Sequence, residues 1–307
     1  MDTRFNALTR ALVVATGIML LASAPASAKS KAAAQAVDVR FAAVAGKAPV
    51  QCGSLITGLG STDQSAELAD FRFYVSQVAL IRSDGRAVSV KLRRNSQFRY
   101  SNRYGAVTLI DLENGTGDCA EEGTSAMNAD VQGTVPSGRY VGVQWTVGVP
   151  AKLNHTDIAG APAPLNLAGM GWSWQYGRKF MKIEVTEPPG TTTPWPSKTF
   201  FVHVGSNGCV GDPATGASVK CALANEAKVR LGHFNPKHQV VDVDLKALLA
   251  GDDITVNRSG APGCMSEETD PECEGVFKAL GISWRADGSG TGKSSSSLQT
   301  VFTVASR

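Results

Sequence analysis

Apolar residues alternate with polar or small residues in six separate segments of the chain. Alternation over about four to eight residues is typical of a half-buried β-strand, because successive side chains point to opposite faces. Turn signals such as Asp84-Gly85 and 136–138 punctuate the gaps. The pattern predicts an all-β fold, and we expect a β-sandwich. The alternating positions are Val37, Val39 and Phe41; Val88, Val90 and Leu92; Val141, Val143, Trp145 and Val147; Met181, Ile183 and Val185; Phe200, Val202 and Val204; and Val241, Val243 and Leu245.

The N-terminus has the three parts of a secretory signal peptide. Arg4 and Arg10 are basic, 11–22 is an apolar run, and Ala26-Ser27-Ala28 is a small-residue cleavage site. Residues 1–28 are therefore predicted to direct export to the periplasm. No later apolar run has the length of about 20 residues that a membrane span needs. The scattered Lys and Arg residues and the net charge of +3 give no sign of nucleic-acid binding.

Helical signals are sparse. The segment 244–250 can form about two turns, with Asp244 near its start and Gly251 just past its end. The segment 65–70 could form one more turn. The remaining chain is long for one domain, but β-sandwiches reach this size. We predict a single disulfide-stapled β-sandwich over residues 29–307, with long loops, one short helix and flexible tracts at 29–36 and 287–297.

All six cysteines follow the predicted cleavage site, and an even number in an exported chain is typical of disulfides. Proximity in the sequence favours Cys209–Cys221 and Cys264–Cys273, which leaves Cys52 for Cys119. Other connectivities remain possible, because sequence alone does not fix the pairing. Zinc is the competing interpretation, but the chain has no C-x2-C spacing.

Residue types that bind soft metals gather between residues 155 and 203, where His155, His203, Met170, Trp172 and Trp174 lie. Imidazole and thioether groups suit copper. The plain structural interpretation places the two Trp on one face of a strand in a β core, and the residue types alone favour it. The sequence contains no P-loop, G-x-S-x-G or H-E-x-x-H motif, and no Ser/His/Asp arrangement stands out.

An ordered set of segments resembles the metallo-mystery pair four-Cys proteins, the MbnP family of periplasmic copper-binding proteins encoded with methanobactin. The resemblance implies that copper is held by His155 and His203. It also implies that a di-haem cytochrome peroxidase partner of the MbnH/MauG type oxidises Trp174, or else Trp172, to kynurenine. The chain itself would then serve copper homeostasis as a binding protein and not as an enzyme. The matching segments are Cys52-Gly53, 58–60, 70–76, 109–117, 148–150 with 153–155, 164–167 with Met170 and Trp172-x-Trp174, Phe180, 202–206 with Gly208-Cys209, and 263–266.

The segment 177–180 departs from the family's usual Gly-Gly-Tyr-Lys-Phe, so Tyr176 is the candidate for a tyrosine near the site. Arg178 and Lys179 could instead face the haem partner. Two alternatives remain open. One is a copper-dependent oxidase, for which the sequence offers no acid/base pair. The other is a disulfide-rich exported binding module without copper, which could hold Ca²⁺ in aspartate-containing loops that do not fit the EF-hand template. Those aspartates are Asp212, Asp252, Asp253 and Asp270.

Overall fold

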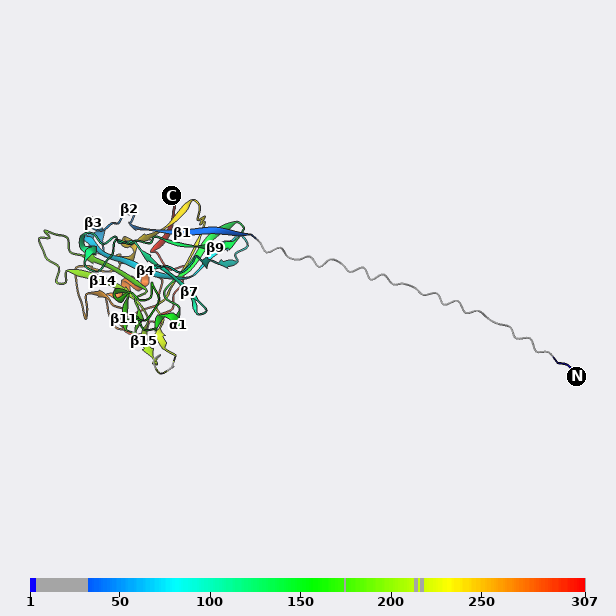
Figure 1. Cartoon of the computed structure of the whole chain (residues 1–307). Coiled ribbons are helices and arrows are strands. Elements are labelled where there is room, and N and C mark those ends of the chain that lie inside the picture. The colour runs from blue at the N-terminus through cyan, green and yellow to red at the C-terminus, as the bar shows by residue number, and fades with distance from the viewer. Residues whose placement is uncertain (4–32, 174, 213–214, 216–217, 307) are drawn as a thin grey trace. The chain divides into compact units, whose positions relative to one another are not determined.

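Strands form most of the regular structure in the computed structural model, which describes residues 1–3, 33–173, 175–212, 215 and 218–306 (Figure 1). Strands account for 43% of the chain and helices for 9%, which confirms the predicted all-β class. Residues from 33 onward form one unit by their contacts. The predicted signal peptide, from residue 4 to residue 28, lies outside the described residues.

A six-stranded sheet contains the first and last strands of the fold. Its order is β20-β18-β1-β9-β6, and β2 pairs with β1. β1 begins at Ala34, which pairs with Pro136, so residues 34–36 are part of a strand and the predicted flexible tract is wrong there. The members are β1 (Ala34–Ala45), β2 (Ala48–Pro49), β6 (Lys91–Leu92), β9 (Asp130–Pro136), β18 (Gln239–Asp244) and β20 (Phe302–Ser306).

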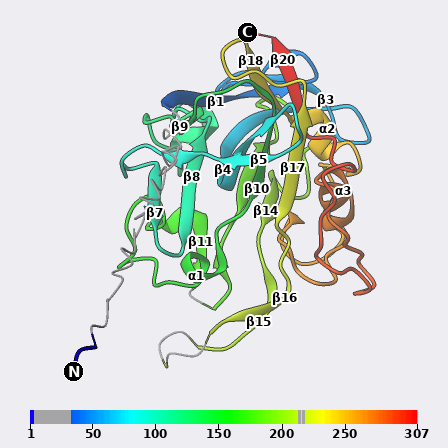
Figure 2. The ribbon, with the colours of Figure 1, turned by 90° about the vertical axis from the view of Figure 1, so that its right-hand side faces the viewer.

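A ten-stranded sheet is built around the long strand β4 (Figure 2). Its main path is β17-β10-β4-β13-β14-β19, while β3, β5 and β8 also pair with β4, and β7 pairs with β8. The members are β3 (Ile56–Leu59), β4 (Gln64–Arg82), β5 (Ala87–Ser89), β7 (Arg99–Asn102), β8 (Gly105–Asp111), β10 (Tyr140–Val147), β13 (Met181–Thr186), β14 (Thr199–Val204), β17 (Ala227–Gly232) and β19 (Gly263–Cys264).

Four aromatic rings join the two sheets. Phe41 of β1 and Phe302 of β20 each contact both Phe73 of β4 and Trp145 of β10, edge to face, with centroids 5.4–5.9 Å apart. Edge-to-face pairs are a favoured arrangement of buried aromatic rings. Because each sheet supplies two of the four rings, the core lies between the sheets, as expected of a sandwich.

Short helices and two small sheets complete the fold. The predicted helix forms as α2 (Leu245–Leu249), and the Asp244 side chain caps it by accepting from the main-chain N of Lys246 and Ala247. The helical turn predicted at 65–70 is wrong, since these residues belong to β4. The remaining elements are α1 (Ala151–Asn154), α3 (Cys273–Ala279), the 3-10 helices η1 (Gly117–Ala120) and η2 (Ala168–Met170), and the pairs β11 (Gly171–Ser173) with β12 (Gly177–Arg178) and β15 (Asn207–Val210) with β16 (Lys220–Leu223).

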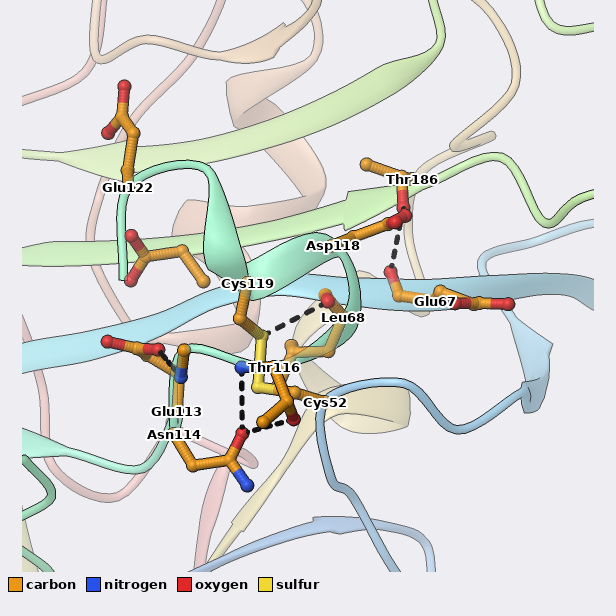
Figure 3. The surroundings of a disulfide bond; sticks show 12 residues. Cys52, Glu67, Leu68, Glu113, Asn114, Thr116, Asp118, Cys119, Glu122 and Thr186 are labelled. Atoms are coloured by element: carbon orange, nitrogen blue, oxygen red, sulfur yellow. Dashed lines mark hydrogen bonds between the residues drawn. A yellow bond between two sulfur atoms is a disulfide. The ribbon is translucent and has the colours of Figure 1, made fainter. Parts of the chain in front are cut away.

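Three disulfides link the six cysteines in the pairs that sequence proximity favours: Cys52–Cys119, Cys209–Cys221 and Cys264–Cys273. The first anchors η1 over the ten-stranded sheet, as Figure 3 shows. The loop around η1 is held by Glu113, whose carboxylate accepts from the main-chain N of Gly115 and Thr124 at 2.7 and 2.9 Å.

Candidate metal centre

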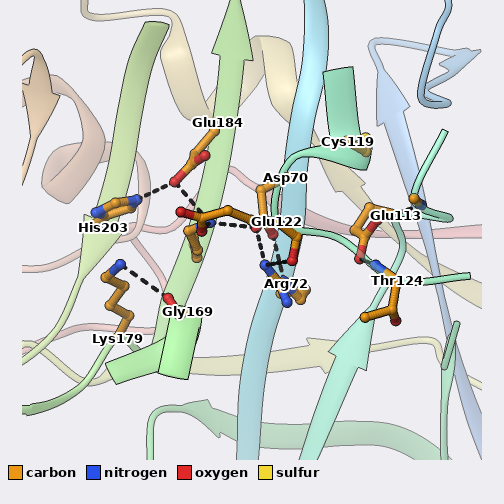
Figure 4. A network of polar contacts seen from close by, with 12 residues as sticks. Asp70, Arg72, Glu113, Cys119, Glu122, Thr124, Gly169, Lys179, Glu184 and His203 are labelled. Carbon is orange, nitrogen blue, oxygen red and sulfur yellow. Dashed lines mark hydrogen bonds and ion pairs between the residues drawn. The ribbon is translucent and has the colours of Figure 1, made fainter. Parts of the chain in front are cut away.

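His203 lies near the end of β14 and is almost fully buried, with 5% of its surface exposed. It pairs in register with Lys182 of β13, and its ring lies 5.2 Å from that of Phe201. The imidazole points toward Glu184 (Figure 4), and its Nε2 lies 2.6 Å from Oε1 of that residue. The other ring nitrogen, Nδ1, is buried and has no hydrogen-bond partner among the described residues.

The surroundings of His203 favour its neutral form. Burial lowers the pKa of His203, and the charges of Lys179 and Lys182 lower it further, against the opposing effect of Glu184. Burial alone would raise the pKa of Glu184, but the hydrogen bond to His203 and the charge of Lys182 hold it below its usual value. An ionised carboxylate can only accept a hydrogen bond, so Nε2 carries the proton. The lone pair of the neutral ring is therefore on Nδ1.

A network of buried charges extends from Glu184 across the sheet (Figure 4). Nζ of Lys182 lies 3.1 Å from Glu184 and 2.7 Å from Asp70, and it also contacts Glu122 of the loop after η1. Asp70 in turn accepts from Nε of Arg72 at 2.8 Å. Both faces of β13 are buried, so its polar positions carry paired charges instead of facing solvent.

His155 directly follows the short helix α1, as its C-cap residue, and is 6% exposed. Pro150 precedes the helix as its N-cap residue, and its carbonyl accepts from the main-chain N of Leu153 and Asn154. The Nδ2 atom of Asn154 lies 3.1 Å from Nε2 of His155, while its Oδ1 accepts from the main-chain N of Arg178 at 2.8 Å. Nε2 of His155 also lies 3.5 Å from Sγ of Cys221.

The segment from β12 onward connects the surroundings of the two histidines. Arg178 N bonds to Asn154 on the side of His155, and Phe180 N donates to the carbonyl of Val204, next to His203. A Cβ atom added at Gly205 would overlap the ring of Trp172, so this indole lies over the chain just after β14.

The other aromatic and sulfur candidates have different surroundings. Trp174 lies outside the described residues. Met170 is fully buried within the hydrophobic core. Tyr176 is 52% exposed.

Arg178 does not face solvent, so the expectation that it meets a partner surface is wrong. The side chain is 1% exposed, and its guanidinium donates to the carbonyls of Leu165, Leu153, Asn154 and Thr156. These bonds join α1 to the loop before η2. Arg178 therefore has a structural role beside the site.

Two groups within the described part of the chain bring three His, Cys, Asp or Glu donor atoms within 4.8 Å of one another. Neither group contains both histidines or an aspartate of the loops considered for calcium. In both groups, two donors are cysteines joined in a disulfide, which has no thiolate to offer a metal. The groups are His155 with Cys209 and Cys221, and Glu113 with Cys52 and Cys119.

Comparison with known proteins places the chain in a family. The model of the MbnP family matches residues 34–266. This chain belongs to the MbnP family. Among solved structures it is similar to MbnP from Methylosinus trichosporium, with 36% identity and a TM-score of 0.77 over 89% of this chain and 99% of that chain. A comparison with curated protein sequences gives no match.

Membership in the MbnP family confirms the resemblance read from the ordered motifs and links the chain to methanobactin-related proteins. The three disulfides are consistent with an exported protein. Of the helices that the structure describes, none is long and apolar enough to cross a membrane.

The sequence motifs missed the residues around His203. Lys182 and Glu184 alternate with the apolar positions of β13, which by itself indicates a solvated face. The sequence did contain one signal. Two apolar segments each carry an acidic and a basic residue two positions apart, Lys182 with Glu184 and Asp70 with Arg72. That signal becomes readable only when the pairing of β4 with β13 is known.

Proposed function

We propose that this MbnP family member is an exported copper-binding protein in which His155 and His203 are the copper ligands. The observation that carries the proposal is the state of His203. Glu184 engages Nε2, and Nδ1 is buried without a partner among the described residues. Metal-binding histidines commonly donate their second ring N–H to a carboxylate, which fixes the ring and the tautomer. Neutral imidazole is also the form that binds metals.

His155 supports the same proposal less directly. Asn154 holds its ring from one side, and the main chain of Arg178 holds Asn154 in turn. Two imidazoles suit copper, and Cu(I) in particular requires few ligands. Bound copper would supply a redox-active soft metal at this end of the fold. The residues of the chain would contribute ring orientation and a buried environment.

The proposal includes the oxidation of Trp174, or of Trp172, to kynurenine by a di-haem peroxidase partner of the MbnH/MauG type. The position of Trp172 over Gly205, close to His203 in the chain, supports an indole beside the site. Peroxide would be the oxidant. Cleavage of the indole C2–C3 bond adds two oxygen atoms while two peroxide molecules are reduced to water, and hydrolysis then releases the C2 carbon as formate.

A binding role fits the described cavities better than catalysis does. A cavity of about 950 Å³ is lined by β1, β9 and the loop at Asn235, and a second of about 290 Å³ lies beside Val78 and Tyr104. Neither of these two cavities is lined by His155 or His203. An oxidase assay on copper-loaded protein tests this part of the proposal, and turnover of a phenol or thiol substrate would contradict it.

Copper analysis of single variants tests the ligands. His155→Ala and His203→Ala, purified after coexpression with the partner, should each lose most bound copper while circular dichroism stays unchanged. His238→Ala is the matched control because this histidine is exposed, and it should retain copper. Full retention of copper by either of the first two variants would refute that ligand.

Mass spectrometry of the peptide that contains Trp172 and Trp174 tests the modification. Coexpression with the partner should change one Trp by the loss of one carbon and the gain of one oxygen. Trp174→Phe and Trp172→Phe then identify the reacting ring. An unmodified peptide from an active coexpression would end this part of the proposal.

A further inference from the structure

The disulfide of the β15–β16 hairpin touches one of the proposed copper ligands. Cys209 and Cys221 form a register pair across the hairpin, and Nε2 of His155 lies 3.5 Å from Sγ of Cys221. The hairpin is a separate two-stranded sheet at the lower end of the ribbon in Figure 2. Three potential donor atoms, a ring nitrogen of His155 and the sulfurs of Cys209 and Cys221, lie within 4.8 Å of one another.

We propose that reduction of the Cys209–Cys221 disulfide converts this contact into a three-donor Cu(I) site made of His155 and two thiolates. The site goes beyond the proposed function, because it does not need His203 and exists in one redox state of the protein only. Thiolates are soft ligands that select Cu(I), and imidazole accepts copper as well. The disulfide therefore acts as the switch that supplies or withholds two ligands.

The chemical step is thiol–disulfide exchange with a dithiol reductant. A thiolate of the reductant attacks Sγ of Cys221, the S–S bond breaks, and Cys209 leaves as a thiolate. The second thiol of the reductant then attacks the mixed disulfide and releases Cys221. The protein gains two electrons and two protons in all, and the reductant becomes a disulfide. Binding of Cu(I) displaces the thiol protons to solvent.

Access favours this disulfide over Cys264–Cys273. Cys221 is partly exposed, so a reductant can reach it. Both sulfurs of the Cys264–Cys273 disulfide are fully buried, with no measurable exposure, whereas the Cys52–Cys119 disulfide joins a buried cysteine to the partly exposed Cys52. A thiolate must reach a sulfur atom in order to exchange, so buried disulfides react slowly. Mild reduction should therefore open the hairpin disulfide before Cys264–Cys273, and peptide mapping selects the conditions that leave Cys52–Cys119 closed.

The geometry of the site suits a metal after a small movement. Bond lengths of about 2.0 Å to nitrogen and 2.3 Å to sulfur, in trigonal or tetrahedral geometry, require an N···S separation of about 3.5–3.7 Å. The observed separation of Nε2 and Sγ is 3.5 Å. The two sulfurs must move apart to about 3.8–4.0 Å, roughly the contact distance of two free thiols. Side-chain rotation can supply this, because the strand pairs at Asn207–Leu223 and Val210–Lys220 hold the main chain.

The second three-donor group provides an internal comparison. Cys52 and Cys119 lie beside Glu113, so reduction there would offer a hard carboxylate in place of an imidazole. Glu113 is already engaged by two main-chain N–H groups of its loop. Cu(I) should therefore prefer the hairpin site even when both disulfides are open.

The experiment uses the full chain with His203→Ala, which removes the copper site of the proposed function. The protein is treated with dithiothreitol until peptide mapping of alkylated samples shows Cys209 and Cys221 free and the other four cysteines still paired. Dithiothreitol is then removed without oxygen, and Cu(I) is added with a competing chelator. The readouts are copper per chain, the near-ultraviolet thiolate-to-copper absorption, and X-ray absorption at the copper edge.

We expect one Cu(I) per chain with both sulfur and nitrogen neighbours in the reduced protein, and no copper in the oxidised protein. Adding His155→Ala should remove the nitrogen neighbour and weaken the reduced site by at least about 10-fold, since loss of outer contacts alone has that effect. Blocking the two thiols with iodoacetamide should abolish binding without a change of sequence. Equal copper in the two redox states, or no effect of His155→Ala, would overturn the proposal. Failure of the proposed function is a separate result, namely no copper in the oxidised protein with His203 intact.

Discussion

Lys182 offers a sharp test of the buried charge network, because one ammonium group contacts three carboxylates of very different exposure. Its side chain is 1% exposed, while those of Asp70, Glu184 and Glu122 are 0%, 10% and 55% exposed. Burial alone would lower the pKa of Lys182, but the charges of Asp70 and Glu184 raise it above its usual value. The side chain is therefore a buried cation at neutral pH.

Replacing Lys182 with Met keeps the apolar stem and removes the charge. Asp70 and Glu184 then remain buried without their shared cation, and breaking a buried ionic group in this way costs about 3–5 kcal/mol. Glu122→Gln removes a contact of the same ammonium at an exposed position, where an ion pair contributes about 0–1 kcal/mol. The two substitutions should therefore differ by about 3 kcal/mol in the free energy of unfolding.

Urea unfolding at pH 7 with the disulfides intact measures both free energies. The dependence on urea concentration should be the same for the wild type and the variants, so that the comparison reports stability alone. A cost below about 1 kcal/mol for Lys182→Met, or equal costs for the two variants, would refute the reasoning that burial decides these contacts.

Three further predictions concern the site, the pH dependence and the longest disulfide loop. Glu184→Gln should weaken copper binding by about 10–100-fold in a chelator competition, because it removes the carboxylate that fixes His203, and an unchanged affinity would count against that role. Burial, as the largest cause, raises the pKa of Asp252 to about 7, so this carboxyl group stays protonated to a higher pH in the folded state than in the unfolded state. Stability should then fall as pH rises from about 4 to about 7, and Asp252→Asn should flatten this fall in urea unfolding at pH 5 and 8. Cys52→Ser with Cys119→Ser opens a loop of 67 residues and should cost about 4 kcal/mol, against about 3 for the hairpin disulfide, as measured by the urea midpoint.

The alternating pattern predicted strands well where one face of a strand meets the inter-sheet core. Val141, Val143, Trp145 and Val147 all lie in β10, where the last three are buried and Val141 is partly buried. The segment 65–70 shows the limit of local signals. Its Ala, Glu and Leu residues favour a helix in isolation, but they continue β4 and bury Ala66 and Leu68 against neighbouring strands. Tertiary pairing outweighs local propensity there.

The predicted ligands came from motifs, whereas their surroundings could not be read from the sequence. Alternation along β13 placed Lys182 and Glu184 on the polar side of a strand, which is normally solvated. In the structure, the loop that carries Glu122 contacts that side. The loop is anchored by the Cys52–Cys119 disulfide, so its position depends on a contact between residues 67 positions apart. No local pattern encodes such a contact.

The two histidines differ in what fixes them, and this difference has chemical consequences. His203 is held by Glu184, a carboxylate that also contacts Lys182 and contains no redox-active group. His155 is held by an amide and lies against a disulfide sulfur, which can gain electrons and become a ligand. A metal bound by both rings would therefore keep one donor fixed in every redox state. The other donor would be exposed to competition from two thiolates, so the proposed redox control of copper would act through His155.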